Sequence, residues 1–482
     1  MGFLKIQHMT NIQLLEIIKA MEPAKRQEMA LFLASPLFNR GKYAHEINRF
    51  YQIILDTAPD FSEADLSKAR VSRLLFSDSD LGKSSLEMLV AKLSKLLRTF
   101  ALMQQYLSEN NEAQQNIDWT RWLRLNGLIL HAQKAVTKLK GKKEGESLES
   151  LEGYRINLLL SEEEIELISL QDQYRYGLNL RMIIYDLDLF YHNYRSEFVN
   201  RYLLQQKVAQ LPDLDILESG LSFYQSDSPL LQISQKIYTV LRNDFPTVGD
   251  FREMIDLIQA NEGALSFVAG SQLYAFLRNA CSLLINTGNF ELNPTLHAIH
   301  IDNLAKGYFF VQGSILPSVY LNLVQVALRV REYAWAKDFT ADFQSRVLGG
   351  DQDRFFYKFN MAHSLFAEGS FDAALDLLLE APSNSHYHHM VRRLEIKLYY
   401  ELRSDLLLYK MDAFRKFIMR TATKILASNL RAMDLNFLNI LTQISQIPPK
   451  DKARSERLLK RIDAKKLLAD RLWLIEKAQE LS

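Results

Sequence analysis

The chain has 482 residues, of which 48% are hydrophobic and 24% are charged, and this composition excludes a mostly disordered chain. At this length a single compact core stops growing, so we expect two domains or an elongated solenoid. The formal net charge of +1 gives no global field that would attract nucleic acid, an anionic membrane or an acidic substrate. A charged partner would therefore have to bind a local patch.

Sparse glycine and proline predict an all-α fold. The sequence contains 18 Gly and 11 Pro, and no proline lies between Pro59 and Pro212. Proline removes a backbone donor and clashes with the preceding turn, so helix is the element that most needs this depletion. We expect an N-terminal helical bundle followed by an array of helix pairs.

Residues 1–140 are expected to form the bundle. Pro23 suits the first turn of a helix, and Pro36 ends that helix because it forces Ser35 out of the helical region. Another long helix, which includes Trp119, is expected to run to Lys140. Between these segments, apolar residues at helical spacing predict one buried stripe: Leu86, Leu89, Val90, Leu93, Leu97, Phe100 and Ala101.

Residues 141–147 are small and charged, without apolar anchors, and we interpret them as a linker. Residues 148–447 are expected to be α-helical, with shorter helices separated by turn residues after Pro212, which is typical of a helical repeat array. Residues 448–482 are expected to form one charged C-terminal helix. A polar terminal helix would cap the apolar end of such a stack.

The segment from Phe355 to Pro382 resembles a tetratricopeptide repeat (TPR). Small residues stand where the paired helices approach each other, large apolar residues stand at core positions, and a glycine stands at the turn between the helices. These residues are Ala362, Leu365, Gly369, Ala374 and Leu378. The resemblance implies a helical hairpin.

Flanking segments follow the same pattern less closely. Upstream, Arg331 replaces the turn glycine, and Ala336 lies 38 positions before Ala374, whereas the family's period is about 34 residues. A third unit is expected near Tyr274, with a second helix that starts late because Asn293 and Pro294 stand where it should already be running. A fourth pair is expected from His389 to Tyr400 and from Asp405 to Arg420. The resemblance is clearest over 274–420, and it implies a right-handed TPR-like solenoid with first helices lining a concave groove.

Such grooves bind peptides or other proteins, so the resemblance implies a non-enzymatic scaffold or adaptor. The groove is expected to mix cations, amides and aromatic rings, which would suit an acidic peptide or a C-terminal carboxylate. We expect its lining to include Arg278, Ser282, Asn286, Leu321, Gln325, Arg329, Phe359, His363, Phe366, Arg393, Lys397 and Tyr400. An alternative is that a terminal helix or the N-terminal domain covers some of these positions.

A second hypothesis is a regulator that contacts nucleic acid or a ribonucleoprotein through basic helices. Lys92, Lys95 and Arg98 form a stripe opposite the apolar one and could contact phosphates, as could the basic run from Lys450 to Arg471. A solvated helix face with mixed charge is the commoner explanation of such stripes. An enzyme with a site between the domains is a third hypothesis, although no local catalytic motif is present.

We expect no cofactor. Histidines cluster at His386, His388 and His389 and at His297 and His300, but neither group has a convincing set of further metal ligands. The uncharged stretch between Lys306 and Arg329 is interrupted by polar residues, so we expect no membrane span. Cys281 is the single cysteine, which fits a reducing compartment, and we expect a cytoplasmic location.

Overall fold

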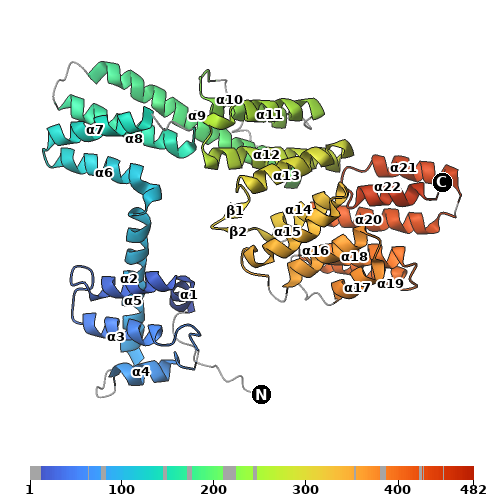
Figure 1. Ribbon diagram of the computed structural model, residues 1–482, viewed down its shortest axis with the longest axis horizontal. Coiled ribbons are helices and arrows are strands. Elements are labelled where there is room, and N and C mark those ends of the chain that lie inside the picture. The colour runs from blue at the N-terminus through green and yellow to red at the C-terminus, as the bar shows by residue number, and fades with distance from the viewer. Residues whose placement is uncertain are drawn as a thin grey trace. The chain divides into compact units, whose positions relative to one another are not determined.

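The computed structural model describes residues 12–62, 64–76, 83–144, 149–170, 176–209, 224–242, 247–351, 354–379, 387–422, 426, 428–448 and 450–481. These residues are almost wholly α-helical, as the glycine and proline content predicts (Figure 1). The chain forms two compact units, Met1–Leu139 and Lys140–Ser482. Each unit is described separately below.

In the first unit, the helices between Ile12 and Phe76 share one core with a long central helix, α5 (Lys83–Tyr106). The helices α2 and α3 contact each other and α5, and α4 contacts α3. Pro23 opens α2, and Ser35 leaves the helical region with extended backbone, as Pro36 predicts. The helices are α1 (Ile12–Ala20), α2 (Pro23–Ala34), α3 (Ala44–Leu55), α4 (Lys68–Phe76), α5 (Lys83–Tyr106), α6 (Glu112–Leu125) and α7 (Ile129–Glu144), with a short 3-10 turn, η1 (Glu109–Asn111).

The predicted apolar stripe lies on α5 and is buried from Leu86 to Phe100, with Leu86 and Leu93 fully inaccessible. It packs against Phe32, Phe50 and other apolar residues of α2, α3 and α4 in one core. The stripe prediction is confirmed for all of its members except Ala101, which is exposed. Helical periodicity located this core because the residues at i, i+3, i+4 and i+7 share one face.

The long helix predicted to run to Lys140 is broken in two. Gly127 adopts a left-handed φ of 74°, and the Leu128 amide donates to the Leu123 carbonyl at 2.9 Å. This is a Schellman-type helix ending, which glycine favours because it lacks a Cβ. Helix α6 therefore ends at Leu125 and α7 begins at Ile129.

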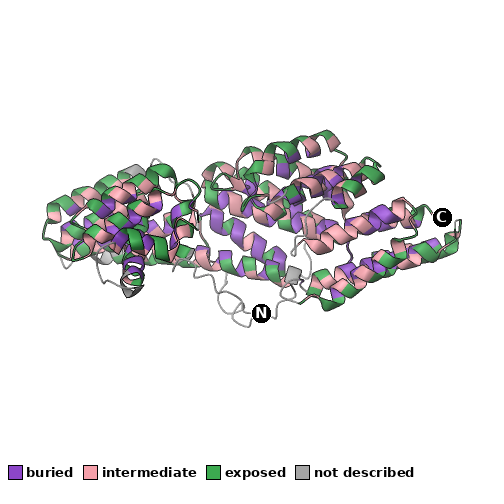
Figure 2. Ribbon diagram, turned by 90° about the horizontal axis from the view of Figure 1, so that it is seen from below, coloured by how far each residue is buried: buried purple, intermediate pink, exposed green. Residues whose placement is uncertain are grey.

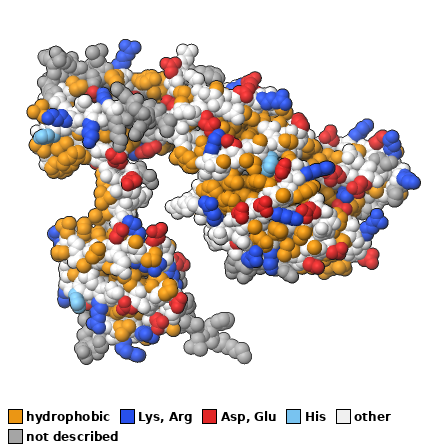
Figure 3. Space-filling view, in the orientation of Figure 1, with side chains coloured by type: hydrophobic (Ala, Val, Ile, Leu, Met, Phe, Trp, Pro, Cys, Tyr) orange, Lys and Arg blue, Asp and Glu red, His pale blue; other side chains and the backbone are white. Residues whose placement is uncertain are grey.

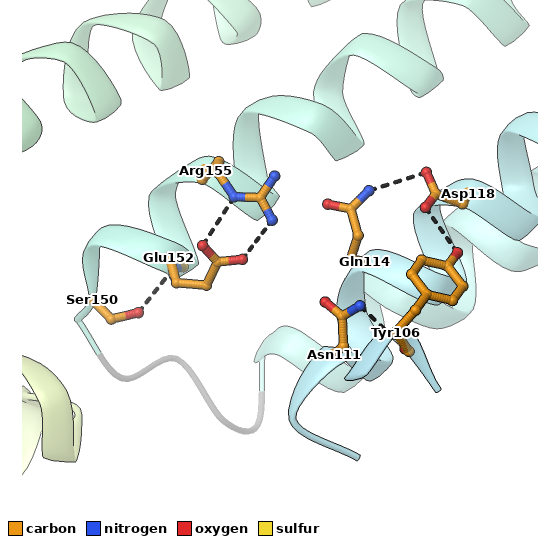
Figure 4. A network of polar contacts seen from close by, with 8 residues as sticks. Tyr106, Asn111, Gln114, Asp118, Ser150, Glu152 and Arg155 are labelled. Atoms are coloured by element: carbon orange, nitrogen blue, oxygen red, sulfur yellow. Dashed lines mark hydrogen bonds and ion pairs between the residues drawn. The ribbon is translucent and has the colours of Figure 1, made fainter. Parts of the chain in front are cut away.

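Polar contacts in the stretch from Tyr106 to Arg155 are shown in Figure 4. In the first unit, the Tyr106 hydroxyl donates to Asp118 Oδ2 at 2.9 Å, and Gln114 Nε2 donates to Asp118 Oδ1 at 3.0 Å. The bond from Tyr106 attaches the end of α5 to α6, and the bond from Gln114 lies within α6. In the second unit, Ser150 Oγ accepts the Gly153 amide at 2.8 Å and so caps the N-terminus of α8.

The second unit begins with two long helices. Residues 141–144, which the sequence analysis assigned to the linker, belong to the end of α7, and residues 145–148 lie outside the described residues. Helices that follow one another in the chain pack side by side from α8 to α19. Their bounds are α8 (Leu151–Ser169), α9 (Tyr176–Ala209), α10 (Pro229–Arg242), α11 (Val248–Ala260), α12 (Phe267–Asn286), α13 (Asn293–Ala305), α14 (Pro317–Arg329), α15 (Tyr333–Phe343), α16 (Phe355–Ala367), α17 (Phe371–Leu379), α18 (His388–Glu401) and α19 (Leu407–Arg420), with 3-10 turns η3 (Glu262–Ala264), η4 (Phe290–Leu292) and η5 (Gln344–Arg346).

The predicted helix pairs are present, and their turns share one backbone geometry. The pairs α12 and α13, α14 and α15, α16 and α17, and α18 and α19 all turn at a residue with positive φ. One residue later, the amide donates to a carbonyl five residues back, as in the 3.0 Å bond from Glu332 to Ala327. The turn residues are Gly288, Arg331, Gly369 and Arg403. As predicted, α13 starts late, at Asn293.

A short β-hairpin interrupts the helices between α13 and α14. Strand β1 (Phe310–Val311) pairs antiparallel with β2 (Ser314–Ile315) through a turn at Gln312 and Gly313, which both have positive φ. The uncharged stretch that was weighed as a membrane span is therefore split between this hairpin and α14. The hairpin was not expected from the sequence, because two-residue strands leave almost no periodic signal.

The single C-terminal helix is the clearest error of the sequence analysis. After α20 (Ser428–Gln446), the described part of residues 448–482 instead forms two helices, α21 (Lys452–Asp463) and α22 (Arg471–Gln479). Asp470 has a left-handed φ of 48° and stands immediately before α22. The Arg471 guanidinium donates to the Ile462 carbonyl at 2.5 Å, so it satisfies a backbone group left open at the end of α21.

Buried residues of the second unit lie on the sides of the helices that face their neighbours (Figure 2). They form three apolar cores along the chain, centred on α12, on α14 with α16, and on α20 with α22. The small residues at the predicted repeat positions, Ala336, Ala362 and Ala374, are fully buried. Close approach of paired helices requires such side chains.

Candidate functional site

A cavity of about 300 Å³ lies along the first helices of the predicted pairs, α12, α14, α16 and α18. Its lining includes seven of the predicted groove residues, which come from all four of these helices. They are Asn286, Gln325, Arg329, His363, Phe366, Arg393 and Lys397. These seven residues form one wall of the cavity.

The opposite wall is formed by the C-terminal part of the same chain. Residues 468–473 and Glu476 line the cavity, together with Met433 of α20. Leu474 is fully buried in the core that α20 and α22 share, so α22 is firmly docked. The alternative in which a terminal helix covers part of the groove is the one found in the structure.

Asp470 joins the two walls through ion pairs. Its carboxylate lies 2.7 Å from Arg393 Nε and 2.9 Å from Lys397 Nζ. Burial raises the pKa of the Asp470 carboxyl, but Lys397 and Arg393 lower it by more, so that the pKa lies well below its usual value. Asp470 therefore stays charged and is held as a carboxylate between two cations.

A second carboxylate lies beneath Arg393. Asp434 of α20 is inaccessible to solvent, and its Oδ1 accepts from Arg393 Nη1 at 2.6 Å. Burial raises the pKa of Asp434, and Arg393 opposes this rise. Asp434 Oδ2 is buried and has no hydrogen-bond partner among the described residues. The guanidinium thus bridges two acids that come from separate helical segments.

Trp473 anchors the C-terminal wall. Its ring Nε1 donates to Glu401 Oε1 at 2.8 Å, and its ring meets Tyr400 edge-on at 5.3 Å. The Lys397 ammonium lies 5.4 Å from the Trp473 ring and 4.6 Å from the Phe366 ring. The ammonium is therefore enclosed by two aromatic faces as well as by a carboxylate, which favours the cation.

His363 and Arg329 complete the polar lining of the cavity and differ in charge. The pKa of His363 falls to about 3, because of burial first and then the nearby cation Lys397. His363 is thus neutral at physiological pH. Arg329 is exposed and makes no ion pair with any residue in the described ranges. Its guanidinium is the cavity's available cation.

Five predicted groove residues do not line the cavity. Arg278 is directed to Asn303 and lies 4.4 Å from the Phe309 ring, and burial lowers its pKa to about 10. Ser282 donates to the Arg278 carbonyl within α12. Phe359 is fully buried, so its placement in an open groove was wrong. Tyr400 packs against Trp473, and Leu321 is also buried.

The predicted basic stripe lies on α5 in the first unit. Lys92, Lys95 and Arg98 are exposed on the side opposite the buried stripe. The Lys92 ammonium lies 4.2 Å from the Tyr43 ring. In the part of the chain that the structure describes, none of the three side chains pairs with a carboxylate.

The histidines expected to be weak metal candidates are engaged with aromatic rings. His297 meets Trp335 edge-on, His300 meets Phe309 edge-on, and His388 stacks on Phe417. His386 lies outside the described residues. Among the residues described, no three His, Cys, Asp or Glu side chains are placed to hold a metal ion. None of the helices in the described ranges has the length and hydropathy that a bilayer crossing requires.

The cavity wall formed by residues after 430 was not predicted from the sequence. Asp470, Arg471 and Trp473 were assigned to a polar capping helix, although Trp473 and Leu474 are large apolar residues in a basic segment. That apolar pair was the available signal for a docked helix. On the face shown in Figure 3, hydrophobic side chains gather over α13, α14 and α16, with charged side chains among and around them.

Comparison with known proteins adds no family. The sequence matches no protein-family model, and neither curated proteins nor solved structures show significant similarity to it.

Proposed function

We propose that this chain is a non-enzymatic binding protein that receives an acidic segment, or the C-terminal carboxylate, of a partner protein in the cavity beside Arg329. The observation that carries the proposal is the pair of ion pairs that Arg393 and Lys397 make with Asp470. The chain's own carboxylate is bound there by two cations and an aromatic enclosure. The same wall continues to Arg329, which Asp470 influences electrostatically but which makes no direct ion pair with a carboxylate among the described residues.

The proposal includes a TPR-like, right-handed solenoid for α12 to α19. Two observations support it: the repeated left-handed turn at Gly288, Arg331, Gly369 and Arg403, and the contacts that α16 makes with both α14 and α18. Contacts between alternate helices are expected when hairpins stack in one direction. First helices then share one side of the stack, on which the cavity lies.

The partner is proposed to bind with α22 in place. Undocking α22 would expose Trp473 and Leu474, which are 7% and 0% exposed, at about 1.5–3 kcal/mol for each side chain. A single new ion pair does not offset this loss. The cavity of about 300 Å³ is at the small end of the roughly 300–1,000 Å³ range of ligand pockets. It suits one or two side chains rather than a long peptide.

The test measures binding of fluorescent acidic peptides with free C-terminal carboxylates and of the same peptides as C-terminal amides. Arg329→Glu should weaken binding of the free acids roughly tenfold or more, because it replaces the available donor with a like charge. Arg252→Glu, an exposed charge reversal on α11, is the matched control. Equal weakening by both variants, at unchanged helicity, would contradict the proposal.

The stripe on α5 supports a second candidate, contact with nucleic acid. Lys92, Lys95 and Arg98 are exposed on one face without carboxylate partners in the described ranges. Binding through this face should weaken steeply as the salt concentration rises. Replacing all three residues by Gln should reduce the slope of log K against log salt by the equivalent of about three released counterions. A salt dependence that is unchanged by the triple substitution would exclude the stripe.

A further inference from the structure

A second pocket, of about 660 Å³, lies among α19, α20 and the end of α21. Three cations line it: Arg415 from α19, Arg461 from α21 and Lys465 from the turn after α21. No Asp or Glu is among its described lining residues. This pocket shares no lining residue with the cavity beside Arg329.

The two guanidiniums are positioned but not neutralised. Arg415 Nη2 donates to Asn439 Oδ1 at 3.0 Å, and Arg461 Nη1 donates to Gln443 Oε1. Asn439 and Gln443 stand one turn apart on α20, where Gln443 Nε2 donates to the Asn439 carbonyl at 2.9 Å. Amide oxygens hold each guanidinium through one nitrogen, so its other donors remain available.

Neighbouring acids do not reach this pocket. On α19, Asp412 pairs with Lys416, and Asp451, which caps the start of α21, pairs with Arg454. Within the described ranges, Arg415, Arg461 and Lys465 make no ion pair. The Arg471 guanidinium donates to the carbonyls of Ile462, Asp463 and Lys465, and so occupies the negative end of α21 that would otherwise weaken an anion site.

We propose that this pocket binds a phosphate dianion carried as a monoester, either on a partner's phosphorylated side chain or on a small molecule. Converging cations from three elements match a tetrahedral group with three free oxygens better than a planar carboxylate, which offers two. The described lining contains no aromatic ring. Single-stranded nucleic acid is bound largely by stacking on such rings, so the pocket lacks the usual platform for bases.

The experiment is calorimetric titration of the full chain, at low and constant ionic strength, with orthophosphate, a phosphoserine peptide and the same peptide without phosphate. Both phosphate probes, or the phosphopeptide alone, should bind the parent chain. Arg415→Gln combined with Arg461→Gln should weaken that binding roughly tenfold or more. The matched control is Arg457→Gln combined with Lys460→Gln, which removes the same charge from exposed α21 positions outside the pocket and should change binding less than about twofold.

Tighter binding of the phosphopeptide than of orthophosphate would identify a phosphorylated protein as the source, and equal binding would identify a small phosphate. Absence of binding by both, or equal weakening by the pocket and control variants, would overturn the proposal. A single-stranded oligonucleotide that binds through Arg415 and Arg461 while the phosphopeptide does not would also overturn it. If the double variant unfolds, Lys465→Gln replaces it, with a loss of roughly threefold or more expected.

Discussion

Arg393 on α18 donates Nε to Asp470 Oδ2 at 2.7 Å, and this contact closes one end of the cavity with the chain's own C-terminal segment. The same guanidinium donates Nη1 to the buried Asp434 on α20 at 2.6 Å. From the sequence, Arg393 was expected to be a groove residue that binds a partner protein. It belongs instead to the packing of α18, α20 and α22. This role makes it a poor reporter of binding and a good reporter of stability.

Removing the Asp470 charge should destabilise the second unit. Asp470→Asn keeps the side-chain shape and suits the left-handed φ of 48°, but it leaves Arg393 and Lys397 without one of their acids. We expect a loss of about 2 kcal/mol in the free energy of unfolding, below the roughly 3–5 kcal/mol of a fully buried pair, because the Asp470 side chain is 24% exposed. Urea denaturation followed by circular dichroism measures it. Asp412→Asn, in an exposed pair with Lys416, should change stability by less than about 0.5 kcal/mol.

The small residues of the helix pairs should be intolerant of enlargement. Ala374 on α17 is fully buried, and its neighbour Ala373 is exposed on the same helix. Ala374→Leu should lower the free energy of unfolding by about 1–3 kcal/mol through overpacking. Ala373→Leu should stay within about 0.5 kcal/mol of the parent. Similar thermal midpoints for the two variants would show that α16 and α17 do not pack as closely as described.

Buried histidine should make the fold sensitive to acid. The pKa of His300 falls to about 3, because of burial first and then the positive charges of Arg278 and His297, whereas its unfolded value is 6.5. Between these values the unfolded chain binds the proton and the folded chain does not, so stability decreases as pH falls from 6.5 towards 3. Down to pH 4 this group alone removes about 3 kcal/mol. His300→Phe, which keeps a ring against Phe309, should reduce this slope in urea denaturation series; an unchanged slope would place the titration elsewhere.

Cys281 should report global opening of the second unit. Its thiol is fully buried on α12, and burial raises its pKa to about 12, so the reactive thiolate is both scarce and inaccessible in the folded chain. Labelling by a thiol reagent should be slow in buffer and should accelerate with urea in parallel with the loss of helicity. Fast labelling in buffer, at full helicity, would contradict the packing of α12 against α13.

The sequence by itself determined the all-α class, the buried stripe of α5 and the presence of the helix pairs with the positions of their turns. These features depend on neighbours within a turn or two: apolar spacing marks the buried face of a helix, and Gly369 marks a turn because it tolerates positive φ. Arg331 and Arg403 were harder to interpret, since arginine gives no such signal, yet both adopt the same left-handed conformation.

Only the tertiary structure decided what lies across the groove from those helices. Lys397 and Asp470 are 73 positions apart, and no local periodicity records that they meet. The break before α22 and the docking of Trp473 follow from burial of distant apolar surface and from charge pairing across it, which are long-range terms of the folding free energy. The repeat pattern could therefore place Arg329, Arg393 and Lys397 on one wall, but only the packed chain shows which of these cations already hold a carboxylate.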